Sequence, residues 1–231
     1  SKNLIKQIVK LKDIKFYDGL GTIYDKTQRL RKLSGMVADE FNLNKEKAEI
    51  AASISKSDLC SDLVNEYPDL QGLMGKYFAV SQGFEEDVSN AVSDHYLPLG
   101  NNSMPAKKPI SYTVAIADKI DTLAGFFLIN EKPTSSKDPL ALRRSAIGLL
   151  RTIIDNKLNL KLRNLISYNI RLFEEQGVKK INENSENEIL NFLKERMKNI
   201  LKDKNIKNDI IEASVSSYFN DNYFDLYKKN T

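Results

Sequence analysis

The side chains that could do chemistry in this 231-residue chain begin with its one histidine, His95, and its one cysteine, Cys60. A Ser-His-Asp triad needs a histidine base beside its nucleophile, and zinc sites take several His or Cys ligands. A lone histidine beside Tyr96, where we expect a helix to end, does not supply either arrangement. With no histidine partner close in sequence, Cys60 is predicted to be a buried structural thiol.

A pair of acids, Asp118 and Asp121, stands one helical turn apart and could bind a cation. Beside Lys119, and without histidines, the same pair is more simply explained as helix charges or salt-bridge partners. The sequence also lacks a Walker loop and a G-x-G-x-x-G motif. We therefore expect no catalytic residue and no metal site in this chain.

The composition is that of a soluble globular protein, with 41% hydrophobic and 29% charged residues. A single cysteine cannot form an internal disulfide, which favours a reducing, cytoplasmic compartment. The longest apolar run, at 123–129, is far below the roughly 20 residues that span a bilayer. The chain opens on Ser1 rather than methionine, so we expect it to be part of a longer protein.

Helical periodicity dominates, and we expect an all-α fold. In the stretch 22–42 an apolar stripe leaves Lys26 and Arg29 off its line, which predicts that they face solvent. Ser185 and Glu188 have the spacing of a capping box, while 97–109 is an irregular connection. The predicted helices are 22–42, one following the cap Asn44, 85–95, 109–130, 139–156, 159–176, 185–202 and 206–220.

Charge is unevenly distributed along the chain. Residues 1–138 carry a net charge of −1 and residues 139–231 one of +5. Within 143–171 there are seven basic residues and one acid. A surplus of this size either attracts a phosphate backbone or forms a solvated face. The break between the two parts is predicted at 131–137.

The stretch "PTSSKDPLALRRSAIGLLR", residues 133–151, combines a helix start with an arginine pair. Asp138 is a good N-cap and Pro139 a good first helical residue. Arg143 and Arg144 lie outside the apolar stripe of this helix. They are candidates for contact with a nucleic acid, or for ion pairs that join the second part of the chain to the first.

Several blocks together resemble the beta-subunit family of bacterial heterotetrameric glycyl-tRNA synthetases. The resemblance covers essentially the whole chain, and its most specific strings are "DLQGLMG" at 69–75 and "SKDPLALRR" at 136–144. The other blocks are "GLGTIYDKTQRLRKLSGMVADEF" at 19–41, "AASISKSDLCSDLVNEYPDLQGLMGKYFA" at 51–79, "DHYLP" at 94–98 and "IADKIDTLAGFF" at 116–127.

The resemblance implies a central piece of a longer subunit: an HD-like helical domain at 1–132 and a basic helical domain at 138–231. HD phosphohydrolases hold metal with a His-Asp pair, an earlier histidine and a later aspartate. Aligning "AASISK" with the helix that bears the pair puts Ser55 and Lys56 at those positions, and only Asp118 matches. Because an ammonium group repels a divalent cation, the resemblance implies a scaffold that has lost its metal ligands.

By the same resemblance, the partners are the alpha subunit, tRNA(Gly) and the remaining domains of the beta subunit, without a membrane. ATP and Mg²⁺ would be used in the alpha subunit, which activates glycine, and this chain would hold no cofactor. RNA duplex is bound largely through phosphate and 2′-hydroxyl groups, which calls for basic side chains on a rigid frame. The candidate tRNA-binding residues are Lys137, Arg143, Arg144, Arg151, Lys161 and Arg163.

Three functions therefore compete. The first is a tRNA-binding and tRNA-positioning part of glycine–tRNA ligase that is not catalytic alone. The second is a purely architectural module that docks domains and subunits. The third is a metal phosphohydrolase with a variant site at Asp118.

Overall fold

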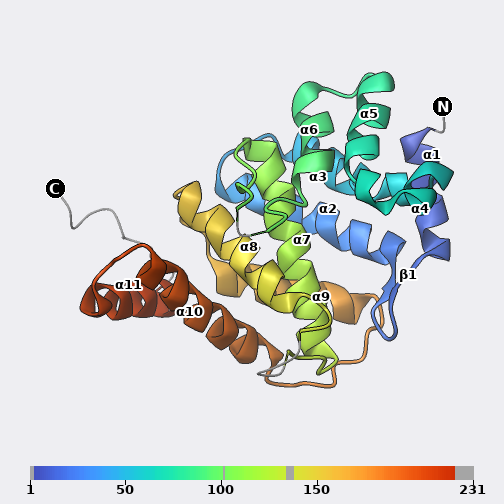
Figure 1. Cartoon of the computed structure of the whole chain (residues 1–231). Helices are drawn as coiled ribbons and strands as arrows, with labels where there is room; N and C mark the ends of the chain where they lie inside the picture. Colours follow the sequence, from blue (N-terminus) through green and yellow to red (C-terminus); the bar gives the residue numbers. More distant parts are fainter. Residues whose placement is uncertain (1–2, 101, 134–137, 222–231) are drawn as a thin grey trace.

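The structure, a computed structural model, describes residues 3–100, 102–133 and 138–221 (Figure 1). Within these residues the chain is helical, and the predicted all-α fold is confirmed. Three 3-10 turns, at Leu11–Asp13, Ser57–Cys60 and Pro68–Leu70, join some of the helices. The α-helices are α1 (Leu4–Lys10), α2 (Ile23–Glu40), α3 (Lys45–Ile54), α4 (Asp62–Glu66), α5 (Leu73–Ser81), α6 (Glu86–Asp94), α7 (Pro109–Leu128), α8 (Leu142–Asp155), α9 (Leu162–Glu175), α10 (Ser185–Asp203) and α11 (Asn208–Asp221).

A small hairpin, which the sequence pattern did not predict, precedes α2. Strands β1 (Lys15–Tyr17) and β2 (Gly21–Thr22) pair antiparallel across a tight turn. The helix then starts at a capping box: Asp25 donates its N–H to the Thr22 hydroxyl, and Thr22 donates its N–H to the Asp25 carboxylate at 2.9 Å. Further on, Asn44 caps α3 by accepting the N–H of Lys47 at 3.0 Å, as predicted.

The start of α8 differs from the prediction. Asp138 does cap the helix, accepting the N–H groups of Leu142 at 2.8 Å and Arg143 at 2.9 Å. The helix itself begins at Leu142, because Ala141 adopts a left-handed conformation with φ of 55°. Pro139 therefore lies in a turn before the helix, and its placement as the first helical residue was wrong.

The predicted capping box at the start of α10 is also wrong. Ser185 is the first helical residue instead of the cap, and its buried hydroxyl has no hydrogen-bond partner among the described residues. Glu188 turns away to accept from Lys132 and Asn182, both at 2.7 Å. The carboxylate thus ties α10 to the segment that follows α7.

Helix α7 runs through the middle of the molecule and is buried on nearly all sides (Figure 1). It packs against α2, α3 and α6 of the first part of the chain and against α8, α9 and α10 of the second. Gly125 allows the closest approach, since a Cβ there would stand 2.7 Å from the ring of Phe173 in α9. One apolar cluster thus extends across the predicted boundary, and the division into 1–132 and 138–231 stays a prediction.

Helices α10 and α11 project to one side of the body, as Figure 1 shows at the lower left. Their apolar faces meet each other and α8, with Leu193, Met197 and Leu201 fully buried. Across the residues that the structure describes, no helix is both long and apolar enough to cross a membrane.

Candidate nucleic-acid interface and buried charge cluster

Two cations of α2 and two carboxylates of α7 meet inside the first part of the chain. Arg29 binds Asp121 with two hydrogen bonds, 2.6 Å from Nε and 3.1 Å from Nη2. Lys26 lies 3.0 Å from Asp121 and 3.0 Å from Asp118. Lys26 and Arg29 are almost fully buried, so the prediction that they face solvent was wrong. Their burial is possible because Asp118 and Asp121, one helical turn apart on the facing helix α7, neutralise both cations.

The three positions taken from the HD resemblance lie at this cluster. The Lys56 ammonium lies 3.2 Å from Asp118 and 2.8 Å from Nε2 of His95. Ser55 caps the end of α3, and its hydroxyl donates to the Ala52 carbonyl at 2.8 Å. Lys56 also lies over the ring of Tyr96, 4.1 Å from its centroid. Lysine 56 and the aspartate thus meet, whereas the serine faces its own helix.

His95 takes part in this cluster as a neutral acceptor. Its Nε2 accepts from Lys56, and its Nδ1 donates to the Val92 carbonyl at 2.9 Å. Burial, together with the charge of Lys56, holds the pKa of His95 well below its ordinary value. The ring is thus held uncharged by its surroundings.

Both carboxylates of the cluster are held in the charged form. Burial alone would raise the pKa of Asp118, but Lys26 and Lys56 outweigh it and hold that pKa well below the ordinary range. Burial opposes Arg29 and Lys26 at Asp121 in the same way, and the pKa again falls. These charges are matched inside the protein rather than presented to a ligand.

The donor set does not fit a divalent cation. The ammonium groups of Lys26 and Lys56 occupy the space around Asp118 from which a metal would have to be bound. Among the described residues, no group of three or more His, Cys, Asp or Glu side chains comes together in a way that could hold a metal ion.

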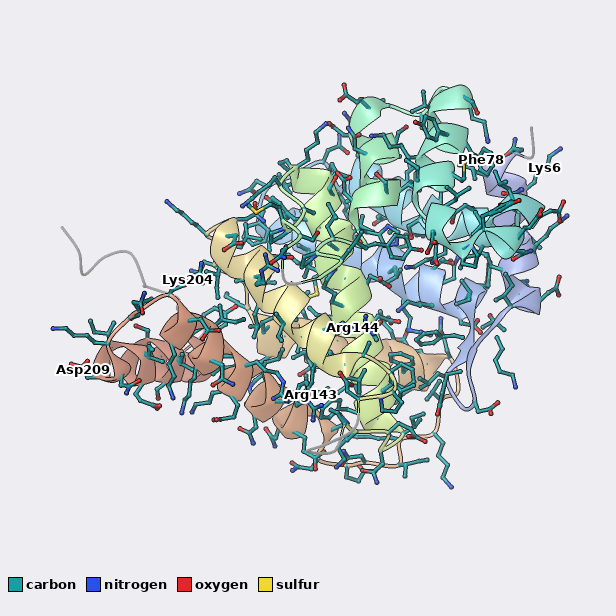
Figure 2. The ribbon with its side chains drawn as sticks, in the orientation of Figure 1. Lys6, Phe78, Arg143, Arg144, Lys204 and Asp209 are labelled. Atoms are coloured by element: carbon teal, nitrogen blue, oxygen red, sulfur yellow. The ribbon has the colours of Figure 1, made fainter. Side chains whose placement is uncertain are left out.

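Several basic residues of the second part line two hollows beside α8, the first between α8 and residues 98–100 and the second between α8 and α10. These adjoining hollows, of about 30 and 530 Å³, share Ile147 and Arg151. Arg144 lines the first hollow, and Arg196 and Lys204 line the second beside Asp155 and Asp203. Figure 2 shows Arg143 and Arg144 on α8, and Lys204 just beyond the far end of α10.

Arg196 lines the second hollow, where the charge of Arg143 acts on it. Burial and the charge of Arg143 lower the pKa of Arg196, although Asp138 and Glu195 partly offset this. Arg196 lies flat on Phe192, 3.3 Å from the ring centroid. The charge of Arg143 thus adds to the positive potential at Arg196.

The other candidate tRNA-binding residues lie in different parts of the structure. Arg151 donates to the carbonyls of Gly100 at 3.1 Å and Ser103 at 2.8 Å, so it holds the 97–109 connection on α8. Arg163 pairs with Glu186, on the other side of α9. Lys161 is exposed before α9, and Lys137 lies outside the described residues. The structure thus brings Arg144 and Arg151 to adjoining hollows, with Arg143 beside Arg144 on α8, but it does not bring Arg163 there.

Sequence reasoning missed several members of both sites. Lys26, Arg29 and His95 were not assigned to the buried cluster, nor Arg196 and Lys204 to the groove. A signal for the cluster was present, because two cations three residues apart in one helix match two acids three apart in another.

Cys60 proved half-buried, with its sulfur 3.6 Å from the Gln7 carbonyl.

Fold and charge together define an all-α protein with matched internal charges and with basic side chains at the hollows beside α8. The sequence profile described as "Glycyl-tRNA synthetase beta subunit" matches residues 1–216. The chain belongs to this family.

Individual relatives agree with the profile. The chain is 42% identical over 222 residues to the glycine–tRNA ligase beta subunit of Clostridioides difficile, covering 95% of this chain and 32% of that protein. It is 40% identical over 213 residues to the beta subunit of Colwellia psychrerythraea, covering 92% of this chain and 30% of the relative. The chain thus spans about a third of the length of these relatives.

Proposed function

We propose that this chain is the part of a glycine–tRNA ligase beta subunit that helps to bind and position tRNA(Gly). The observation that carries the proposal is the set of basic side chains at the hollows beside α8, which are lined by Arg144, Arg151, Arg196 and Lys204. A rigid row of guanidinium groups suits phosphates, which accept two hydrogen bonds from one arginine. Membership of the family supports the choice of tRNA as the polyanion.

Glycine activation, with its ATP and Mg²⁺, is assigned in this proposal to the alpha subunit. The alpha subunit and the remaining domains of the beta subunit are the protein partners, and the cytoplasm is the compartment. The buried charge cluster then serves as a frame. Matched internal charges join α2 to α7. Helix α7 in turn supports α8, which carries the arginines.

Binding of tRNA(Gly) to this chain tests the proposal. We expect binding whose affinity falls steeply with salt, because each phosphate contact releases counterions. The double variant Arg143→Glu with Arg144→Glu should lose at least tenfold in affinity. The matched control is Lys15→Glu, since Lys15 is exposed on the hairpin, away from the groove. Equal affinity in both variants would contradict the proposal.

An architectural role is the second candidate, and the contacts of Arg151 favour it. That guanidinium satisfies two backbone carbonyls of the 97–109 connection, as a structural arginine does. If the groove only docks protein, charge reversal at Arg143 and Arg144 would weaken assembly with the alpha subunit. The tRNA affinity of the whole enzyme, measured on complexes that still assemble, would then be unchanged.

A further inference from the structure

A second groove lies beside α5, built by the motif "DLQGLMG" at 69–75, which the proposed function leaves unused. Its volume is about 470 Å³. Segments far apart in sequence form its walls: the start of α5, the end of α6 and the beginning of the 97–109 connection. The lining residues are Pro68, Asp69, Gln71, Leu73, Ser93, Asp94, Tyr96, Leu97 and Leu99.

The glycine of the motif brings one wall against the other. Gly72 has φ of 80°, and a Cβ there would stand 2.8 Å from the ring of Tyr96. Beside it, Gln71 donates to the Tyr96 hydroxyl at 2.6 Å. Tyr96 in turn lies on Lys56, so the back of the groove rests on the buried charge cluster. The floor is therefore rigid and preformed.

The groove is negative. Asp69 and Asp94 line it, and its lining contains no lysine or arginine. Two of the N–H groups at the start of α5 are already used, because Gly72 and Gly75 donate theirs to the Asp58 carboxylate at 2.7 and 3.2 Å. A phosphate or another anion is thus disfavoured here, whereas a cationic group is favoured.

The rim of the groove is apolar and continues beyond it. Leu99 is 73% exposed on one side and Leu73 is 45% exposed on the other. From Leu73 the exposed side chains of Tyr77 and Val80 follow along the same face of α5. The spacing of four and three residues gives an apolar stripe about 10 Å long, at 1.5 Å per residue. A small cation would not cover such a stripe.

We propose that this groove and stripe bind a segment of a partner protein that presents a lysine or arginine between apolar side chains. The cationic head would lie between Asp69 and Asp94, and the apolar neighbours would cover Leu73 and Leu99. Burying two leucine side chains of this kind favours specific contact within a larger interface. This groove differs in charge from the hollow that contains Arg144, although Leu99 lines both.

Two short peptides test it by NMR titration of this chain. The probe is acetyl-Leu-Arg-Leu-amide, and the comparison is acetyl-Leu-Glu-Leu-amide. We expect the arginine peptide to bind saturably, with a Kd at least fivefold lower than that of the glutamate peptide. The shifted signals should be those of Leu73, Tyr96 and Leu99.

The variant Asp69→Asn should weaken the arginine peptide at least threefold, because it removes an exposed charge and leaves the fold intact. The matched control is Asp209→Asn, an exposed acid on α11, far from the groove (Figure 2). Equal binding of both peptides, absence of saturable shifts at the groove, or shifts produced there by tRNA instead would each overturn the proposal.

Discussion

The buried cations of α2 and the exposed cations of α8 are the same residue types in opposite settings. Arg29 is held by Asp121, by Gln176 and by the ring of Phe173, 3.7 Å from its centroid. Arg144 stands exposed at the edge of a groove, with no acid paired to it among the described residues. The comparison teaches that basic residues indicate a nucleic-acid surface only where the fold leaves their charge unmatched.

The largest expected effect on stability comes from removing a carboxylate that pairs with the buried cations of α2. Asp121→Asn leaves Lys26 and Arg29 inside the protein without half of their counter-charge. Removal of one partner of a buried ion pair costs about 3–5 kcal/mol. We expect the free energy of unfolding, measured in urea, to fall by this amount.

An exposed pair provides the control for that variant. Asp155 pairs with Lys204 at 3.1 Å on the surface. Exposed salt bridges are worth about 1 kcal/mol or less, so Asp155→Asn should scarcely move the urea midpoint. If the two variants were equally stable, the buried cluster would not be structural.

A pH dependence is expected from Lys119, which donates to the carbonyls of His95 at 3.1 Å and Leu97 at 2.7 Å. Burial lowers the pKa of Lys119 to about 8, against an ordinary value of 10.5. Between those values the unfolded lysine is protonated while the folded one is not, so unfolding takes up a proton. The free energy of unfolding therefore rises with pH across this window.

The variant Lys119→Met isolates that contribution. The difference in stability between the wild type and this variant should increase by roughly 2–3 kcal/mol from pH 8 to pH 10, since one pKa unit corresponds to about 1.4 kcal/mol. Urea unfolding at several pH values measures it. A difference that stays flat or falls over this range would show that Lys119 is charged throughout.

A smaller loss of stability is expected from overpacking the contact between α7 and α8. A Cβ at Gly148 would stand 2.8 Å from Cε of Lys119, whose ammonium group is already pinned. Overpacking of this kind costs about 1–3 kcal/mol, so Gly148→Ala should lower the melting temperature. Gly100→Ala is the control, because nothing lies within 4 Å of its added methyl group.

The smallest expected effect is on the salt dependence of tRNA binding, and it concerns the exposed arginine of α8. Arg144→Gln removes one charge from the groove without touching the core. The slope of log affinity for tRNA(Gly) against log salt should become shallower by about 1. Lys15→Gln, on the hairpin, should leave the slope unchanged. A slope that responds equally to both substitutions would point to a diffuse charge effect.

Most of the helices were predictable from sequence, since apolar residues recur at helical spacing in α2, α7 and α10. The start of α8 was not, because a left-handed residue at Ala141 shifts the helix while Asp138 still caps it. Such a turn depends on local backbone choices that periodicity does not record.

The two sites were predictable to different degrees. The arginines of α8 followed from their place off the apolar stripe, and two of them, Arg144 and Arg151, line adjoining hollows in the structure. The burial of Lys26 and Arg29 could not be read from α2 alone, since it depends on the acids of a helix about ninety residues later. A charge pattern matched between two distant helices has to be sought in pairs.

Helix α7 is covered by helices from both halves of the chain, and this limits how the protein can be divided. A piece that ended at residue 132 would keep α7 but would lose the Phe192 ring that packs on Phe127 and the two N–H groups, of Ile181 and Asn182, that donate to the Leu128 carbonyl. We expect such a piece to aggregate or to recruit the missing helices when both are made together. Insertions of whole domains should then be tolerated only outside α7 and the helices that cover it.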